Sequence, residues 1–306
     1  MSPRALFTCP MDYGANPGVD AITHGLDNRL REDGTELEVA FADFRHGDAA
    51  AASARAIDAA VAEGFAAIVI YVLDPLRDRE PVARARSAGV PVFAFERPRF
   101  AVDGALVYPN FNQGVYMADH LASLLAAGSR VAVIGGPKII DDEELLTGIV
   151  YGVDHGGLVR VNDPFEDRWR NETDVREGGR EVARRLLSEY DRLDGLIPFN
   201  DETMIGTVDA LEETGRIGLP MVSRNGTPLA VEAVRKGSTA GTWDISCPEI
   251  GAALGALVSR RLGAGTSPAD ELVVGPIGRM IDASNLDDWK PWSERIPFHR
   301  LTVRDR

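Results

Sequence analysis

Short apolar segments recur along the whole chain, and each is of a length that suits one buried β-strand. Between them, apolar side chains follow the three-to-four-residue spacing of helices with one buried face. This spacing predicts helices at residues 18–30, 50–62, 114–125, 143–153, 175–187, 201–211, 229–234 and 250–262, and another helix after Asp74. The predicted strands are 5–9, 37–41, 66–72, 91–95, 105–108, 131–134, 158–161, 195–199, 220–222, 241–243 and 271–274.

Cap residues agree with this alternation. Asn16 precedes Pro17, which is the usual pattern of an N-cap followed by the first helical position. Glycines stand where the predicted helices should end, at Gly64, Gly89, Gly128, Gly215 and Gly237. Strict alternation of strands and helices predicts an α/β protein whose parallel sheets are covered by helices on both faces.

The chain of 306 residues is long enough for about two domains. It also resembles itself: strand, polar residue, helix and a short strand after proline occur near residues 66–97 and again near 195–225. Two similar α/β domains are the simpler interpretation, and chance similarity is the alternative. No low-complexity linker separates them, which favours a hinge over free tumbling.

The charge balance excludes some partners. Lys and Arg number 33 and Asp and Glu number 47, so the net charge is −14. Nucleic acid and anionic lipid both need a basic face, so neither is expected as a partner. The two cysteines, Cys9 and Cys247, could form one disulfide or remain buried free thiols.

The location depends on how the chain begins. The sequence contains no apolar stretch of about 20 residues that could cross a membrane. The apolar run after Met1 is too short for a secretory leader. We therefore expect a periplasmic protein or a cell-surface lipoprotein if a leader has been removed, and a cytoplasmic protein if Met1 is the native start.

Polar side chains gather directly after the predicted strands. In open α/β sheets, ligands bind beyond the carboxyl ends of the strands. Asp, Asn, Glu and Arg suit a small polyhydroxylated ligand, because they offer both donors and acceptors. Aromatic rings could stack on a sugar. The candidate ligand-binding residues are Asp12, Tyr13, Asn16, Glu96, Arg97, Asn110, Trp169, Asn200, Arg224, Asn225 and Asp244.

Structural roles compete with binding at several of these positions. Asn16, Asp141 and Asp201 could be N-caps, and Glu96 and Arg97 could form a plain surface ion pair. The acidic run from Asp141 to Glu144 is most simply a helix start favoured by the helix dipole.

Signals for catalysis are weak. The motifs Gly-x-Ser-x-Gly, His-Glu-x-x-His and Gly-x-x-x-x-Gly-Lys-Ser/Thr are absent, and the five histidines show no metal-ligand spacing. We therefore expect no catalytic residues, no metal and no cofactor.

Several motifs, in order and spacing, resemble the type I periplasmic solute-binding proteins, in the ribose-binding-protein-like branch that serves sugar ABC transporters. The residues that carry the resemblance are Asn16-Pro17, Asp74-Pro75, 88–92 with Glu96-Arg97, Gly114 with Ala118, 199–206, 225–228, 242–244 and 248–251. The resemblance implies two Rossmann-like lobes joined by three crossings, with residues 1–107 plus 245–276 in one and 108–244 plus 277–306 in the other.

The resemblance also implies a function. The chain would capture a sugar or polyol by hinge closure as a monomer, and deliver it to an ABC transporter permease. The sequence departs from the family at Gly18-Val19, Glu143, Glu96-Arg97 and Arg224-Asn225. These departures put a pentose or hexose in question, and Arg97, Arg99 and Arg224 raise a sugar acid as an alternative.

Two other functions stay open from the sequence. Repressors of the lactose type share the lobe pair, so the chain could be an effector-sensing core without its DNA-binding head. An enzyme on a Rossmann-like fold is the other alternative, because fold alone does not determine function.

Overall fold

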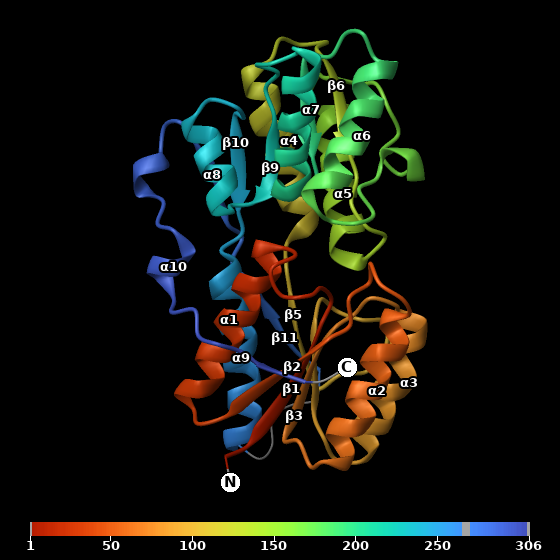
Figure 1. The fold of residues 1–306 in the computed structure, drawn as a ribbon, viewed down its shortest axis with the longest axis vertical. Helices are drawn as coiled ribbons and strands as arrows, with labels where there is room; N and C mark the ends of the chain where they lie inside the picture. The colour runs from red at the N-terminus through yellow and green to blue at the C-terminus, as the bar shows by residue number, and fades with distance from the viewer. Residues whose placement is uncertain (1, 265–269, 305–306) are drawn as a thin grey trace. The chain divides into compact units, whose positions relative to one another are not determined.

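The chain folds into two compact α/β units. The computed structural model describes residues 2–264 and 270–304 (Figure 1). The first unit comprises Met1–Tyr108, Cys247–Pro276 and Trp292–Arg306, and the second comprises Pro109–Ser246 and Ile277–Pro291. The chain therefore passes between the units four times, near residues 108, 246, 276 and 291.

The last segment differs from the sequence expectation. The sequence assigned all of 277–306 to the second lobe, with three crossings, but residues 292–306 belong to the first unit. The reason is strand β13 (Thr302–Val303), which pairs in parallel with β2 (Glu36–Phe41). Arg304 then forms an ion pair with Glu38 at 3.0 Å.

The first unit is built on a seven-stranded sheet in the order β11-β5-β4-β3-β1-β2-β13. All of its strand pairs are parallel, as the sequence predicts. The remaining strands are β1 (Arg4–Cys9), β3 (Ala67–Tyr71), β4 (Val92–Phe95), β5 (Gly104–Val107) and β11 (Glu271–Val274). Side chains of Phe7 and Phe95 meet in the core, with ring centroids 5.6 Å apart.

Helices cover this sheet on both faces. Helices α1 (Pro17–Glu32) and α9 (Cys247–Ala264) lie on one side, and α2 (Ala49–Ala62) and α3 (Pro75–Ser87) lie on the other (Figure 1). The short helix α10 spans Trp292–Arg295. Cys9 and Cys247 are both buried and are not joined in a disulfide, and burial raises the pKa of Cys9 to about 12.

The second unit has two three-stranded sheets, in the orders β7-β6-β8 and β12-β10-β9. A parallel bridge between Leu196 and Met221 links them. The strands are β6 (Arg130–Ile134), β7 (Val159–Arg160), β8 (Gly195–Pro198), β9 (Val222–Asn225), β10 (Gly241–Asp244) and β12 (Arg279–Asp282). Strand β12 was not predicted, and it pairs with β10 in the antiparallel direction, so this unit is not purely parallel.

The second unit also has apolar layers on both faces of its strands. One layer contains side chains of α4 (Asn110–Leu124) and α5 (Ile140–His155), and the other contains those of α6 (Arg176–Glu189), α7 (Asp201–Thr214) and α8 (Pro228–Arg235). The 3₁₀ helices η1 (Asp167–Trp169) and η2 (Leu286–Asp288) complete the unit.

Glycines allow three helix pairs to approach closely. A Cβ on Gly25 of α1 would lie 2.0 Å from the carbonyl of Pro248, and one on Gly251 of α9 would lie 1.9 Å from that of Ile22. The same reciprocal arrangement joins α4 to α5 through Gly114 and Gly148, and α6 to α7 through Gly179 and Gly206. These contacts leave no space for a side chain, so the glycines fix how the helices pack beside the strand ends.

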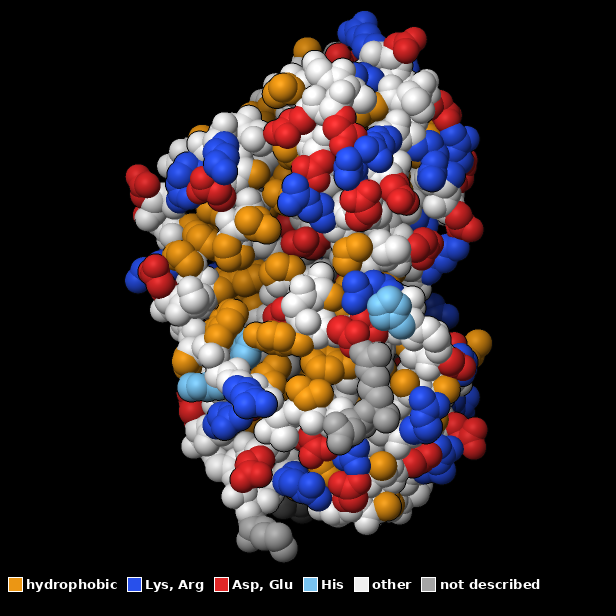
Figure 2. Space-filling model, viewed as in Figure 1, with side chains coloured by type: hydrophobic (Ala, Val, Ile, Leu, Met, Phe, Trp, Pro, Cys, Tyr) orange, Lys and Arg blue, Asp and Glu red, His pale blue; other side chains and the backbone are white. Residues whose placement is uncertain are grey.

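None of the described helices is both long and apolar enough to span a membrane. Acidic and basic side chains alternate over the region of α6 in the view of Figure 2. Several of them form ion pairs between α6 and α7, such as Arg176 with Asp209 and Arg184 with Glu213. Such exposed pairs contribute little to stability individually.

Candidate functional site

The strongest group of candidate residues lies at the strand ends of the second unit. Arg224, near the end of β9, donates from Nη1 to Asn110 Oδ1 and from Nη2 to Asp142 Oδ1, both at 3.0 Å. The side chains of Arg224 and Asp142 are only 6% and 5% exposed. The guanidinium therefore joins β9 to the first turns of α4 and α5.

The role of Asp142 was missed in the sequence. Its acidic run was interpreted as a helix start, and the structure does place Asp141, Asp142 and Glu143 in the first turn of α5. Asp141 is not the N-cap, because that position is Ile139. Burial raises the pKa of Asp142 well above its usual range, as does the neighbouring Asp141, and the Arg224 guanidinium opposes this rise.

A second group lies at the junction of β8 and α7. Asn200 is the N-cap of α7, with its Oδ1 accepting from the backbone N–H of Thr203 at 3.0 Å. Its Nδ2 donates to Asp174. Asp174 has a positive φ of 52°, which is uncommon for a residue other than glycine. No sequence pattern marked Asp174, because it lies in the irregular segment before α6.

Asp201 has a structural role, although not as a cap. Its carboxylate accepts from Thr242 Oγ1 at 2.7 Å, from the backbone N–H of Thr227 at 2.7 Å and from Ser223 Oγ. It therefore connects α7 to β9, β10 and α8. Burial raises the pKa of Asp201 to about 6, although these hydrogen bonds act in the opposite direction.

Glu202 is the least satisfied acid of this group. It is 8% exposed, and its buried Oε1 has no hydrogen-bond partner among the described residues. Burial raises the pKa of Glu202 to about 7, and the negative charges of Asp201 and Asp174 add to this rise. Asp174, which also bonds to Asn200, therefore lies together with Glu202 and Asp201 in an acidic part of the unit.

The end of β10 supplies the last group. Asp244 accepts from the indole Nε1 of Trp289 at 3.1 Å and from the backbone N–H of Ser246 at 2.7 Å. Asn225, paired beside it on β9, is buried and has a positive φ of 126°. Gly226 follows with a positive φ of 73°, and a Cβ there would lie 2.5 Å from Asp244 Cβ, so only glycine fits this turn.

Trp169 does not belong to this surface, so its prediction as a stacking platform is wrong. Its ring is 2% exposed and packs in the core with Tyr190, while the Arg168 guanidinium lies 4.2 Å above the ring. The sequence contained no signal for this, since an aromatic residue in an irregular segment suits a core as well as a binding surface.

In the first unit, the candidate residues bond to both backbone and side-chain groups. Asn16 is the N-cap of α1 and accepts from the N–H of Gly18 at 2.9 Å, as the capping interpretation predicts. Tyr13 is 54% exposed, and its hydroxyl lies 3.0 Å from His24 Nε2. The backbone N–H of Asp12 donates to Asp43 at 2.9 Å.

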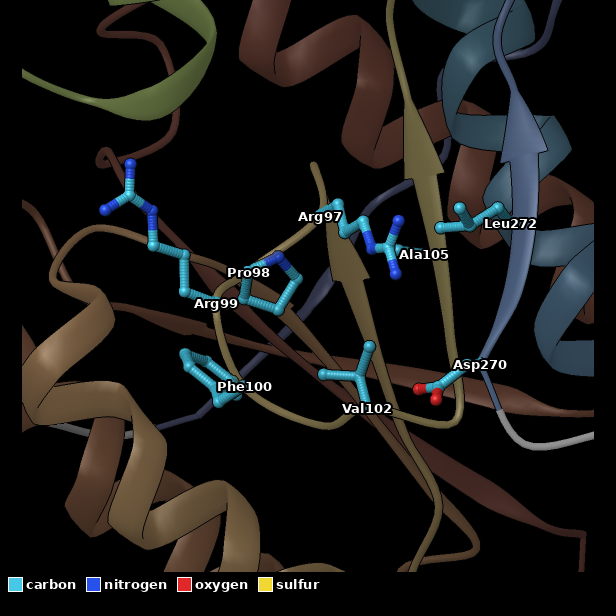
Figure 3. A pocket seen from close by; sticks show the side chains of 8 residues that line it. All are labelled: Arg97, Pro98, Arg99, Phe100, Val102, Ala105, Asp270 and Leu272. Atoms are coloured by element: carbon cyan, nitrogen blue, oxygen red, sulfur yellow. The ribbon is translucent and has the colours of Figure 1, made fainter.

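Glu96 and Arg97 lie at the end of β4 and have different environments. Glu96 is buried with a positive φ of 61°, and its Oε1 accepts from the N–H of Tyr108 at 3.3 Å. Such a conformation at a strand end is often associated with function. Arg97 is exposed and lines a hollow of about 470 Å³. Figure 3 shows that it reaches toward Ala105 and Leu272, whereas Arg99 extends the other way.

Asp12, Asp43 and His46 have potential ligand atoms within 4.8 Å of one another. However, Asp43 already accepts from the Arg45 guanidinium and from the N–H of Asp12. The hydrogen bonds from Arg45 and Asp12 lower the pKa of Asp43 to about 2, although burial acts in the opposite direction. These residues form an internal ion pair with an exposed histidine beside it, and we do not assign a metal site to them.

The sequence matches the periplasmic binding protein domain over residues 10–266. The chain belongs to the periplasmic binding protein family. A curated relative is the xylitol-binding protein of Mycolicibacterium smegmatis (strain ATCC 700084 / mc(2)155), which is 24% identical over 194 residues. That match covers 61% of this chain and 53% of the relative, so the chain spans about half the length of the curated relative.

Solved structures show the same fold. One is an ABC transporter periplasmic solute-binding protein from Actinobacillus succinogenes 130z with bound D-allose, at a TM-score of 0.80 and 18% identity over 94% of this chain and 100% of that one. A galactofuranose-binding protein matches at a TM-score of 0.82 and 17% identity, over 94% and 96% of the two chains.

A third is the binding component of the arabinose ABC transporter from Shewanella sp. ANA-3, bound to α- and β-L-arabinofuranose. It has a TM-score of 0.81 and 17% identity, over 95% of both chains. These likenesses establish the two-unit α/β fold of the periplasmic binding proteins for this chain.

Proposed function

We propose that this periplasmic binding protein captures a neutral sugar or polyol and delivers it to an ABC transporter. The observation that carries the proposal is the buried set of planar hydrogen-bonding groups at the strand ends of the second unit, centred on Arg224, Asn110 and Asn200. Amides, carboxylates and a guanidinium offer donors and acceptors in fixed positions, which suits several hydroxyl groups on one small ligand.

The relatives support this ligand class. The curated relative is named for xylitol, and the solved structures hold D-allose or arabinofuranose. All of these ligands carry several hydroxyl groups on a short carbon chain. We propose a ligand of the same general size for this chain, held by Asn110, Asn200, Arg224, Asn225 and Asp244 of the second unit together with Asp12, Tyr13, Asn16, Glu96 and Arg97 of the first.

The proposed mechanism is binding without catalysis. A ligand that hydrogen-bonds to both units stabilises the arrangement in which they share it, and this shifts a population of open and closed conformations. Delivery then requires an ABC transporter permease as partner and a location outside the cytoplasmic membrane. Genes for a permease and an ATPase beside this gene would support transport, and their absence would favour a regulator core.

A thermal-shift screen over sugars, alditols and sugar acids tests the ligand class. A ligand present at 100 times its Kd should add about 2.7 kcal/mol to the free energy of unfolding. Titration calorimetry of the hits then supplies their affinities. Failure of every neutral polyhydroxylated compound, with the apo protein folded, would contradict the proposal.

X-ray scattering tests the mechanism separately. Saturation with a confirmed ligand should reduce the radius of gyration, because hinge closure makes the molecule more compact. Asp244→Ala should weaken this compaction, since Asp244 lies at the end of β10 close to the passage between the units. An unchanged radius with a confirmed ligand would instead indicate a rigid binding site.

A further inference from the structure

The guanidinium of Arg224 is already bonded inside the second unit. Both Nη groups of its guanidinium are used, one by Asp142 and the other by Asn110. A guanidinium that receives a ligand carboxylate does so with two parallel N–H donors. Here an internal carboxylate occupies part of that fork, and both side chains of the pair are almost completely buried.

Several other cations of the second unit have carboxylate partners, whereas Arg279 of β12, opposite Asp244, donates to the backbone carbonyl of Asp288. In the described part of the second unit, Lys138 pairs with Asp167, Arg170 with Glu143, and Arg176 with Asp209. The surrounding acids include Glu202, whose Oε1 is buried without a hydrogen bond among the described residues. An anionic ligand beside Arg224 would therefore meet carboxylates, one of which already pairs with the guanidinium.

We propose that Asp142 is a specificity-determining residue that makes the second unit reject sugar acids and accept the matching neutral polyols. This inference rests on the proposed function, because it names the ligand class that the same residues select. Without the Asp142 carboxylate, Arg224 would keep Asn110 as a partner and could direct its second Nη toward a ligand carboxylate. The distinction matters because Arg224 on its own suggests a binder of sugar acids.

Two ligand pairs isolate this charge. Xylitol and D-xylonate differ only at one terminal carbon, where an alcohol is replaced by a carboxylate, and D-sorbitol and D-gluconate differ in the same way. Calorimetry with all four compounds gives an alditol-to-aldonate affinity ratio for each variant. The wild-type ratio should exceed 10, and Asp142→Asn should raise aldonate affinity at least tenfold while alditol affinity changes less.

Two further variants separate Arg224 from a general loss of negative charge. Asp154→Asn removes the same charge from the far end of the same helix, where its partner is Arg160, so the ratio should stay near the wild-type value. The double variant Asp142→Asn with Arg224→Gln removes both members of the pair and should lose the aldonate gain. Circular dichroism of each apo variant establishes that it is folded.

The outcomes are distinct. A wild-type protein that binds aldonates as well as alditols would overturn the inference, as would an equal aldonate gain in Asp154→Asn or no gain in Asp142→Asn. If Asp142→Asn does not fold, Asp142→Ser carries the same expectation, since serine leaves space beside Arg224. An aldonate gain in a protein whose wild type binds no neutral polyol would support Asp142 while contradicting the proposed function.

Discussion

The two units use different means to hold the polar residues at their strand ends. In the first unit, Asn16 and Glu96 bond to nearby backbone N–H groups, while Tyr13 is exposed. In the second unit, side chains bond to other side chains far away in the sequence, as Arg224 does to Asn110 and Asp142. Substitutions at Arg224, Asn110 and Asp142 are therefore expected to be coupled with one another.

The largest expected effect is in the second unit. Arg224→Ala leaves Asp142 and Asn110 buried without their guanidinium, so we expect a loss of about 3–5 kcal/mol in the free energy of unfolding. Urea denaturation followed by fluorescence measures it. A loss below about 1 kcal/mol would mean that the network does not stabilise the unit.

Glu202 makes the second unit sensitive to pH. Its folded-state pKa, about 7, lies above the usual value of 4.5, so the folded chain binds a proton more tightly than the unfolded chain. Stability from this group is therefore greatest at low pH and is lost as pH rises through about 7. We expect the loss to be about 2–3 kcal/mol between pH 5 and 8.

The variant Glu202→Gln should remove the part of the pH dependence that comes from this group, so that its advantage in stability over the wild type is larger at pH 8 than at pH 5. Melting curves over this range measure the difference. The exposed Glu177 of α6 provides the control, since Glu177→Gln should leave the wild-type slope in place. If Glu202→Gln keeps the full wild-type slope of stability against pH, that slope comes from other acids.

The two capping asparagines compare the units directly. Asn16→Ala should cost about 1 kcal/mol, because it removes the cap of α1. Asn200→Ala should cost about 2 kcal/mol, because Asn200 caps α7 and also bonds to Asp174. Equal costs in denaturation experiments would show that the Asp174 bond adds nothing.

The smallest effect on stability is expected in the first unit. Arg97→Ala should change the free energy of unfolding by less than about 0.5 kcal/mol, because the side chain is exposed. Affinity for a confirmed ligand should nevertheless fall about tenfold, as expected for a lost hydrogen bond of about 1.4 kcal/mol. Unchanged affinity would mean that Arg97 does not bind the ligand and only lines the hollow beside Ala105 and Leu272.

The alternation of strands and helices could be predicted because buried parallel strands give nearly continuous apolar runs. Strand β12 was not predicted because its segment, Arg279–Asp282, begins and ends with a charged residue and resembles a connecting loop. Strand β13 consists of only two residues, both exposed, and it is a strand because it pairs with β2. Neither carries a local hydrophobic pattern.

The site was predictable to the extent that topology brings strand ends together. That rule placed Arg224, Asn225 and Asp244 directly after predicted strands, and the structure pairs Asn225 of β9 with Asp244 of β10. It could not identify Asp142 as the partner of Arg224, because the two are 82 positions apart and side-chain pairing depends on packing. The prediction for Trp169 was wrong for a related reason, because the ring is buried by packing against α6 and Tyr190.

The return of the chain to the first unit has a consequence for synthesis. A chain made from its N-terminus supplies β1 to β5 first, but the first sheet also needs β11 and β13, which come after residue 270. The second unit has five of its six strands by Asp244. We therefore expect the second unit to acquire structure while the first still exposes two sheet edges, so that nascent chains depend on chaperones mainly through the unit that is made first.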